Sequence, residues 1–140
     1  MTMGKTMGKL CIYNRSAENG ELSAVIVRKL YPDIELLGWA DCDETPWDKI
    51  LEADEIWLVG VTFYPWEEMR AAHSYADHQV IWIDNRQESI DAERDAESHG
   101  EPRFPGLRDA GRAVCDLTWE YCFPNEPMPS YVLVAALMER

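Results

Sequence analysis

The sequence is poor in basic residues, has no long hydrophobic run and holds no Cys-x-x-Cys pair. Its 13 Lys and Arg residues stand against 26 Asp and Glu residues, so the formal net charge is −13. Proteins bind nucleic acid largely by neutralising phosphates with Lys and Arg. This charge balance therefore argues against direct binding to nucleic acid or to an anionic membrane. No apolar run approaches the roughly 18 residues that a membrane-spanning helix needs.

The cysteines and histidines also lack the spacing of a zinc site. We therefore expect reduced, mostly buried thiols, as in a cytoplasmic protein, and we expect no cofactor. The start of the chain has neither the apolar stretch nor the cleavage site of a signal peptide, which agrees with a cytoplasmic location. The four cysteines are Cys11, Cys42, Cys115 and Cys122.

The length of 140 residues is typical of one domain. The chain opens with a repeated Thr-Met-Gly-Lys, whose Gly-Lys-Thr lacks the preceding strand that a phosphate-binding loop requires. We therefore expect residues 1–8 to form a flexible N-terminal tail. Residues 9–140 are expected to form a single α/β domain, with no second, substrate-binding domain.

Short apolar segments alternate with amphipathic ones along the chain. This alternation predicts a mostly parallel, Rossmann-like sheet of four to five strands with helices on both faces. Strands are expected at 9–13, 34–39, 55–59 and 79–83, and helices at 21–30, 45–48, 66–76, 89–97, 111–123 and 131–138. Thr45 is the expected N-cap of the second helix, and Ser130 that of the last. Residues 99–106 (HGEPRFPG) are expected to form a surface loop.

The helix expected at 131–138 is apolar nearly all round. Such a helix is buried, either in its own fold or against a partner. A homodimer is one arrangement that would cover it. The helix at 89–97 is the opposite case, because it is dense in acidic residues and is expected to face solvent.

In an open α/β sheet, sites form outside the carboxyl ends of the strands. This rule selects the stretches 14–20, 42–44, 60–65 and 84–89, in which amides and hydroxyls are more common than charges. No catalytic residue is assigned. The candidate ligand-binding residues are Asn14, Ser16, Asn19, Gly20, Thr62, Asp84, Asn85, Arg86, Gly111 and Arg112.

Four motifs in order carry a resemblance to a known family. Residues 12–20 (IYNRSAENG) are similar to a strand ending in Tyr-His that leads toward Asp-Gly, and residues 58–69 (LVGVTFYPWEEM) to Val-Asp-Phe-Ser before a Pro-Glu-Glu helix. Residues 83–87 (IDNRQ) take the place of an Asp-His-His motif. Residues 110–124 are similar to a Ser-Gly-Ala helix that ends in Trp-Glu-Tyr-Phe-Phe-Pro. The chain thus resembles the N-terminal domain of the DHH phosphoesterase superfamily, collinearly from residue 10 to 138.

This resemblance implies manganese-assisted hydrolysis of phosphoesters at a paired metal site built from Asp and His. The sequence departs from that ligand set at nearly every position, and Asp84 is the one ligand position retained. A further Asp of the family falls near Leu137 or Glu139. Since two divalent cations need several anionic oxygens, we expect no metal and a degenerate, non-catalytic member of the family. The substituted ligand positions are Asn14, Asn19, Gly60, Asn85 and Arg86.

Three functions follow as hypotheses. The first is a binding protein, such as an inhibitor or regulator, that docks its acidic surface on a basic protein partner or holds a nucleotide or small phosphate in the vestigial cleft. In the cleft, Arg86 and Arg112 either bind that anion or pair with acidic side chains, and Asp84 either serves the site or caps a turn. The second is a manganese-dependent phosphoester hydrolase with a rebuilt metal site, in which Asp41, Asp43 and Glu44 join Asp84. The third is an oligomerising structural protein.

Overall fold

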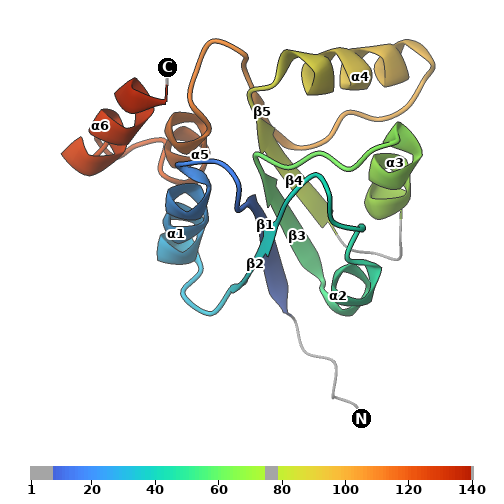
Figure 1. Cartoon of the computed structure of the whole chain (residues 1–140), viewed down its shortest axis with the longest axis horizontal. Helices are drawn as coiled ribbons and strands as arrows, with labels where there is room; N and C mark the ends of the chain where they lie inside the picture. The colour runs from blue at the N-terminus through green and yellow to red at the C-terminus, as the bar shows by residue number, and fades with distance from the viewer. Residues whose placement is uncertain (1–7, 75–78, 140) are drawn as a thin grey trace.

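Five parallel strands form one sheet in the order β2-β1-β3-β4-β5 (Figure 1). The computed structural model describes residues 8–74 and 79–139. The α/β fold with a parallel, Rossmann-like sheet predicted from the sequence is confirmed. The strands are β1 (Lys9–Asn14), β2 (Glu35–Trp39), β3 (Glu55–Val59), β4 (Gln79–Asp84) and β5 (Gly106–Arg108), and the helices are α1 (Gly20–Leu30), α2 (Trp47–Glu52), α3 (Trp66–Ser74), α4 (Gln87–Ser98), α5 (Val114–Cys122) and α6 (Ser130–Met138).

The strand order places helices on both sides of the sheet. From β1 the chain moves outward to β2 through α1, then returns across β1 to β3 and continues outward to β4 and β5. Because crossovers between parallel strands are right-handed, the reversal of direction puts α1 on one face and α2, α3 and α4 on the other. Helices α5 and α6 lie with α1 (Figure 1).

The side chains of the strands alternate between two hydrophobic cores, as the two-residue period of a strand requires. Along β3, Trp57 and Val59 pack with α1 and α5, whereas Ile56 and Leu58 pack with α2 and α3. Both faces of the central strands are therefore buried, which is why these strands are almost wholly apolar in sequence.

Several predicted boundaries were wrong. Helix α2 begins at Trp47 with Pro46 as its N-cap, because Thr45 uses its backbone carbonyl to accept the N–H of Trp47 at 2.8 Å. Helix α6 begins at Ser130 itself, with no side-chain cap. Helix α5 begins only at Val114, so residues 111–113 lie in the loop before it. The end of the helix expected at 66–76 falls partly outside the described residues.

The fifth strand, β5, begins at the last residue of the loop expected at 99–106 and was not among the strands located from the sequence. It is only three residues long, and the φ angle of Gly106 is +129°, in a region that favours glycine. A buried ion pair fixes this edge: the Arg108 guanidinium donates to Glu93 of α4 at 2.8 and 3.0 Å, and also to the carbonyl of Trp82. Both charged side chains are less than a tenth exposed.

Two further expectations concern the N-terminal segment and the last helix. The expected tail at 1–8 falls outside the described residues except for Gly8, whose carbonyl accepts the N–H of Asp54 at 2.8 Å. Helix α6 was expected to be buried in its own fold or against a partner, and on the chain itself only Val132 and Ala136 are buried. Within 8–74 and 79–139, no helix combines the length and the apolar character needed to cross a membrane.

Candidate functional site

The carboxyl ends of the three central strands meet at one cavity. Tyr13 is paired with Val59, and Val59 with Ile83, so the residues that follow each of them lie side by side at the sheet edge. The loop from β1 and the start of α1 close one side of a cavity of about 180 Å³. It is lined by Asn14, Ala17, Asn19, Gly20, Val59, Gly60, Asp84, Asn85, Arg86, Val114 and Glu139.

Glycine is required where α1 starts beside β1. A Cβ on Gly20 would lie 1.9 Å from the carbonyl oxygen of Asn14, so the helix could not approach the strand this closely with any other residue. Gly60 has a φ of +71°, which favours glycine for a different reason. Gly20 and Gly60 both line the cavity, so their backbone conformations help to determine its shape.

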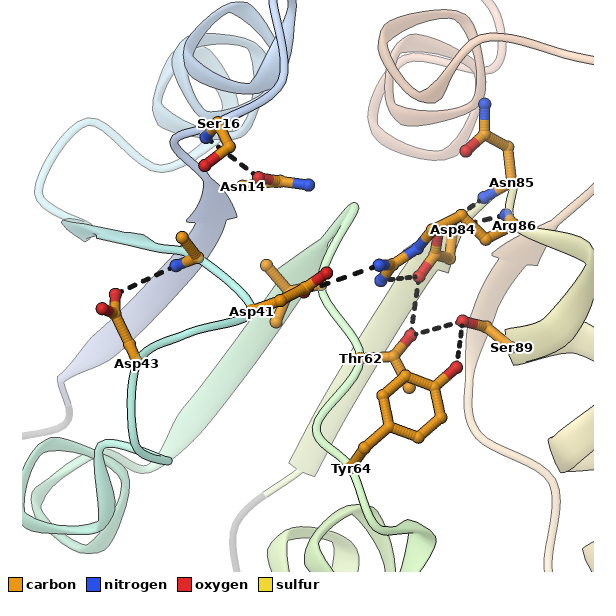
Figure 2. A network of polar contacts seen from close by, with 12 residues as sticks. Asn14, Ser16, Asp41, Asp43, Thr62, Tyr64, Asp84, Asn85, Arg86 and Ser89 are labelled. Carbon is orange, nitrogen blue, oxygen red and sulfur yellow. Dashed lines mark hydrogen bonds and ion pairs between the residues drawn. The ribbon is translucent and has the colours of Figure 1, made fainter.

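Asp84 is the hub of the polar network at this edge (Figure 2). Its side chain is fully buried. One carboxylate oxygen accepts the backbone N–H groups of Asn85 and Arg86 at 2.8 and 3.2 Å, and Arg86 Nε at 3.3 Å. The other accepts the Thr62 hydroxyl at 2.7 Å and Arg86 Nη2 at 3.0 Å. The carboxylate therefore caps the turn after β4 and has five donors around it.

A chain of hydroxyl groups leads from the surface to this carboxylate (Figure 2). The Tyr64 hydroxyl lies 3.0 Å from the Ser89 hydroxyl, which lies 2.9 Å from the Thr62 hydroxyl. The Thr62 hydroxyl lies within hydrogen-bond distance of both Asp84 and Ser89, so its single proton can be donated to either of them. The sequence analysis selected Thr62 and Asp84 but missed Tyr64 and Ser89, although both stand in the stretches that the strand-end rule selects.

Arg86 places its guanidinium between two carboxylates. It binds Asp84 through two nitrogens, and its Nη1 lies 3.8 Å from a carboxylate oxygen of Asp41. Burial lowers the pKa of this guanidinium, but the hydrogen bond and the charge of Asp84 raise it, and the net pKa lies above the ordinary value. Arg86 is therefore a fixed cation at the point where the resemblance implies a metal ion.

Glu139 enters the cavity from the end of α6. Its carboxylate accepts from the Asn19 side-chain amide at 3.3 Å and from the Asn85 side-chain amide at 3.1 Å. The same two amides also donate to backbone carbonyls, Asn19 to Ala135 and Asn85 to Arg112. The sequence analysis named Glu139 only as a neighbour of a family position. The feature of the sequence that could have indicated it is that Glu139 directly follows a predicted helix with no charged residue.

The remaining candidates lie apart from this cavity. Arg112 turns to α5, where it pairs with Asp116 at 2.7 Å and Glu120 at 2.6 Å, so it does not face Arg86. The hydrogen bond to Asp116 raises the pKa of Arg112. Gly111 and Arg112 line a neighbouring cavity of about 240 Å³, which shares Asn85 and Glu139 with the first. Ser16 is not in the lining of either, and its backbone N–H donates to Asn14 Oδ1 at 3.0 Å (Figure 2).

The acidic residues after β2 form a separate group. Asp41, Asp43 and Glu44 line another cavity, of about 320 Å³, whose lining includes Thr62 but not Asp84. Asp43 is ion-paired with Arg15. Its carboxylate also accepts the backbone N–H of Ala40 at 3.0 Å, the contact drawn at Asp43 in Figure 2. The hydrogen bond from Arg15 lowers the pKa of Asp43 below its ordinary value.

The side chains around the first cavity do not fit a pair of divalent cations. Asp84 is already saturated by five donors, Gly60 has no side chain, and the amide N–H groups of Asn19 and Asn85 are directed at Glu139. Two adjacent cations would also stand against the Arg86 charge. Within the described part of the chain, no three His, Cys, Asp or Glu side chains are grouped so as to hold a metal ion.

Comparison with known proteins adds no relative: no protein-family model matches the chain, and no curated protein or solved structure matches it. The relationship to DHH phosphoesterases therefore stays a prediction from the four motifs. The chemistry of the site has to be inferred from its own geometry.

Proposed function

We propose that this protein is a non-catalytic, DHH-like binding protein that acts on a protein partner with a basic surface, as an inhibitor or regulator. The observation that carries the proposal is the Asp84–Arg86 pair. The single family carboxylate kept at the strand ends has its hydrogen-bonding capacity filled by the chain itself, and a guanidinium stands beside it. Hydrolysis through two metal ions would need several free carboxylate or imidazole ligands, and Asp84 is not free to serve as one.

The surface supports a partner of opposite charge. Helix α4 has exposed carboxylates at Glu88, Asp91 and Asp95, spaced so that they follow one face of the helix. Arg94 is the exposed cation on the same helix, 3.8 Å from Asp91. With a chain charge of −13, such a face attracts a basic protein at long range and speeds its association.

The α4 face is tested with a lysine- and arginine-rich peptide of disordered sequence as the probe. Its affinity is measured by fluorescence anisotropy over a salt series. We expect the triple variant Glu88→Gln, Asp91→Asn, Asp95→Asn to weaken binding about tenfold, because three exposed ion pairs contribute on the order of 0.5 kcal/mol each. The dependence on salt should weaken with it.

The matched control neutralises three exposed carboxylates on other helices, in the variant Glu21→Gln, Asp48→Asn, Glu52→Gln. Both triple variants change the net charge equally. If the control weakens binding as much as the α4 variant does, net charge alone drives association, and α4 is not the docking face.

The hydrolase alternative has its own experiment. Calorimetric titration with Mn²⁺ and an assay with a generic phosphodiester should give no binding and no turnover in the wild type. Tight Mn²⁺ binding with turnover that disappears in Asp84→Ala would overturn the proposal. The acidic group after β2 is the source of ligands in that alternative, and Arg86 would have to leave its position between Asp41 and Asp84.

The alternative to a protein partner is a nucleotide or small phosphate bound in the cleft. Its two candidate guanidiniums, Arg86 and Arg112, are both engaged with carboxylates. Asp84 and Glu139 line the same cavity, whose volume of about 180 Å³ is small beside the roughly 300 Å³ or more of an ordinary ligand pocket. We therefore favour the protein partner.

A further inference from the structure

Helix α6 exposes an apolar surface that the rest of the chain leaves uncovered. Its nine residues, Ser130–Met138, include no charged side chain. Val132 and Ala136 pack inward, beside α5. The exposed fractions of the five large side chains on the outer face are 53% for Tyr131, 48% for Leu133, 54% for Val134, 63% for Leu137 and 71% for Met138.

The exposed face has a ridge and a groove on either side of Val134. With 100° between successive residues of a helix, Leu133 and Leu137 lie on one side of Val134, and Tyr131 and Ala135 on the other. The second side borders an open groove of about 550 Å³. The groove is lined by Glu18, Asn19, Ser130, Tyr131, Val134, Ala135 and Met138.

This arrangement is self-complementary. Val134 is the central residue of α6, so a two-fold axis beside it sets two helices antiparallel with Val134 against Val134. In that register the two-fold axis keeps each side of the helix on its own side of the interface, so Leu133 and Leu137 of one copy lie beside Leu133 and Leu137 of the other. The four leucines interdigitate on one side of the axis, and on the other side Tyr131 of each copy lies beside Met138 of its counterpart, at the open groove.

The size of the surface also suits a second copy. At about 150 Å² for a large buried side chain, the five exposed side chains present on the order of 400 Å² of apolar surface. A standard interface buries about 800 Å² per partner, of which roughly 60% is apolar. Helix α6 alone therefore supplies most of the apolar part. No like charges meet at its centre, despite the net charge of −13.

We propose that α6 forms an antiparallel, two-fold symmetric interface with a second copy of this chain, with Val134 at the axis. This interface is independent of the basic partner proposed above. The two differ in their response to salt: screening strengthens the association of two chains that are both acidic, whereas it weakens binding to a basic partner.

The test is sedimentation equilibrium of the full chain across the micromolar range, at low and high salt. The wild type should dimerise reversibly, and more tightly at high salt. Val134→Glu and Val134→Lys should each raise the dimer dissociation constant more than about 100-fold, because each sets like charges against one another at the axis. An equimolar mixture of the two variants should dimerise again, since Glu then faces Lys. Circular dichroism checks that both variants fold.

The control is Leu51→Glu, which places the same charge at another exposed leucine, on α2 across the sheet. It should dimerise as the wild type does. A wild type that stays monomeric at every concentration and salt overturns the proposal, as does a dimer that Leu51→Glu disrupts equally. If each Val134 variant is monomeric and their mixture stays so, the antiparallel register about Val134 is wrong.

Discussion

Replacing Asp84 by Asn removes the charge at the centre of the strand-end network while keeping the shape of the side chain. The asparagine retains one acceptor oxygen, and its amide nitrogen must face donors whichever way the side chain is turned. Either the Thr62 hydroxyl and Arg86 Nη2, or the backbone N–H groups of Asn85 and Arg86, then lose their acceptor. The variant also leaves Arg86 without its buried counter-charge.

The magnitude follows from burial. Removing one partner of a buried ion pair costs about 3–5 kcal/mol, whereas an exposed pair is worth about 0.2–1 kcal/mol. Asp84 is fully buried, but the Arg86 side chain is 26% exposed and can recover some hydration. We therefore expect Asp84→Asn to lower the free energy of unfolding by about 3 kcal/mol, a large share of the roughly 5–15 kcal/mol that stabilises a typical domain.

Urea unfolding followed by tryptophan fluorescence measures this change. The matched control is Asp116→Asn, which removes the same kind of charge from the partly exposed pair with Arg112 and should cost at most about 1 kcal/mol. A double-mutant cycle adds Arg86→Gln, whose effect should be much smaller when Asp84 is already Asn. Equal losses for Asp84→Asn and Asp116→Asn would refute the role of Asp84 as hub.

Three further outcomes are expected. Glu93→Gln should lower the free energy of unfolding by about 3–5 kcal/mol in urea melts, because both members of the Glu93–Arg108 pair are buried; a loss below about 1 kcal/mol would contradict this. Iodoacetamide at neutral pH should modify Cys42 alone in the native chain, and mass spectrometry showing more than one adduct would be the contrary result. Burial protects the other thiols and raises the pKa of each, to about 11 for Cys115 and about 12 for Cys122. The lowered pKa of Asp43 contributes stability above its ordinary pKa of 3.8, which is lost as the pH falls through the folded-state value. Asp43→Asn should therefore flatten the acid side of the urea midpoint against pH, and unchanged slopes would count against the Arg15–Asp43 pair.

The sequence was sufficient to predict the parallel sheet and the edge at which the candidate site lies. Apolar segments that are buried on both faces stand out along the chain, and parallel strands bring their carboxyl ends to one side. Asn14 and Asp84 could therefore be expected at the same edge of the sheet, whereas the order of the strands between them could not be predicted. The strand β5 was missed because three residues, Gly-Leu-Arg, have no periodicity to detect, and because a buried ion pair rather than apolar packing holds them.

Contacts between distant segments could not be predicted. Glu139 reaches the amide of Asn19 across 120 positions of the chain, and no local pattern specifies that contact. The partner of Arg86 was equally open, since 26 acidic residues are available and only the fold decides which lies nearest. The sequence left open whether α6 is covered by its own fold or by a partner, because an apolar composition indicates that a helix is covered without showing what covers it.

The guanidinium beside Asp84 is joined to the chain by covalent bonds. A bound metal ion can be removed by a chelator or exchanged for a competing ion, and its occupancy follows the supply in the cell. A positive charge fixed to the polypeptide has none of these dependences. The strand-end network is therefore assembled by folding alone and should keep its form in media with or without divalent ions.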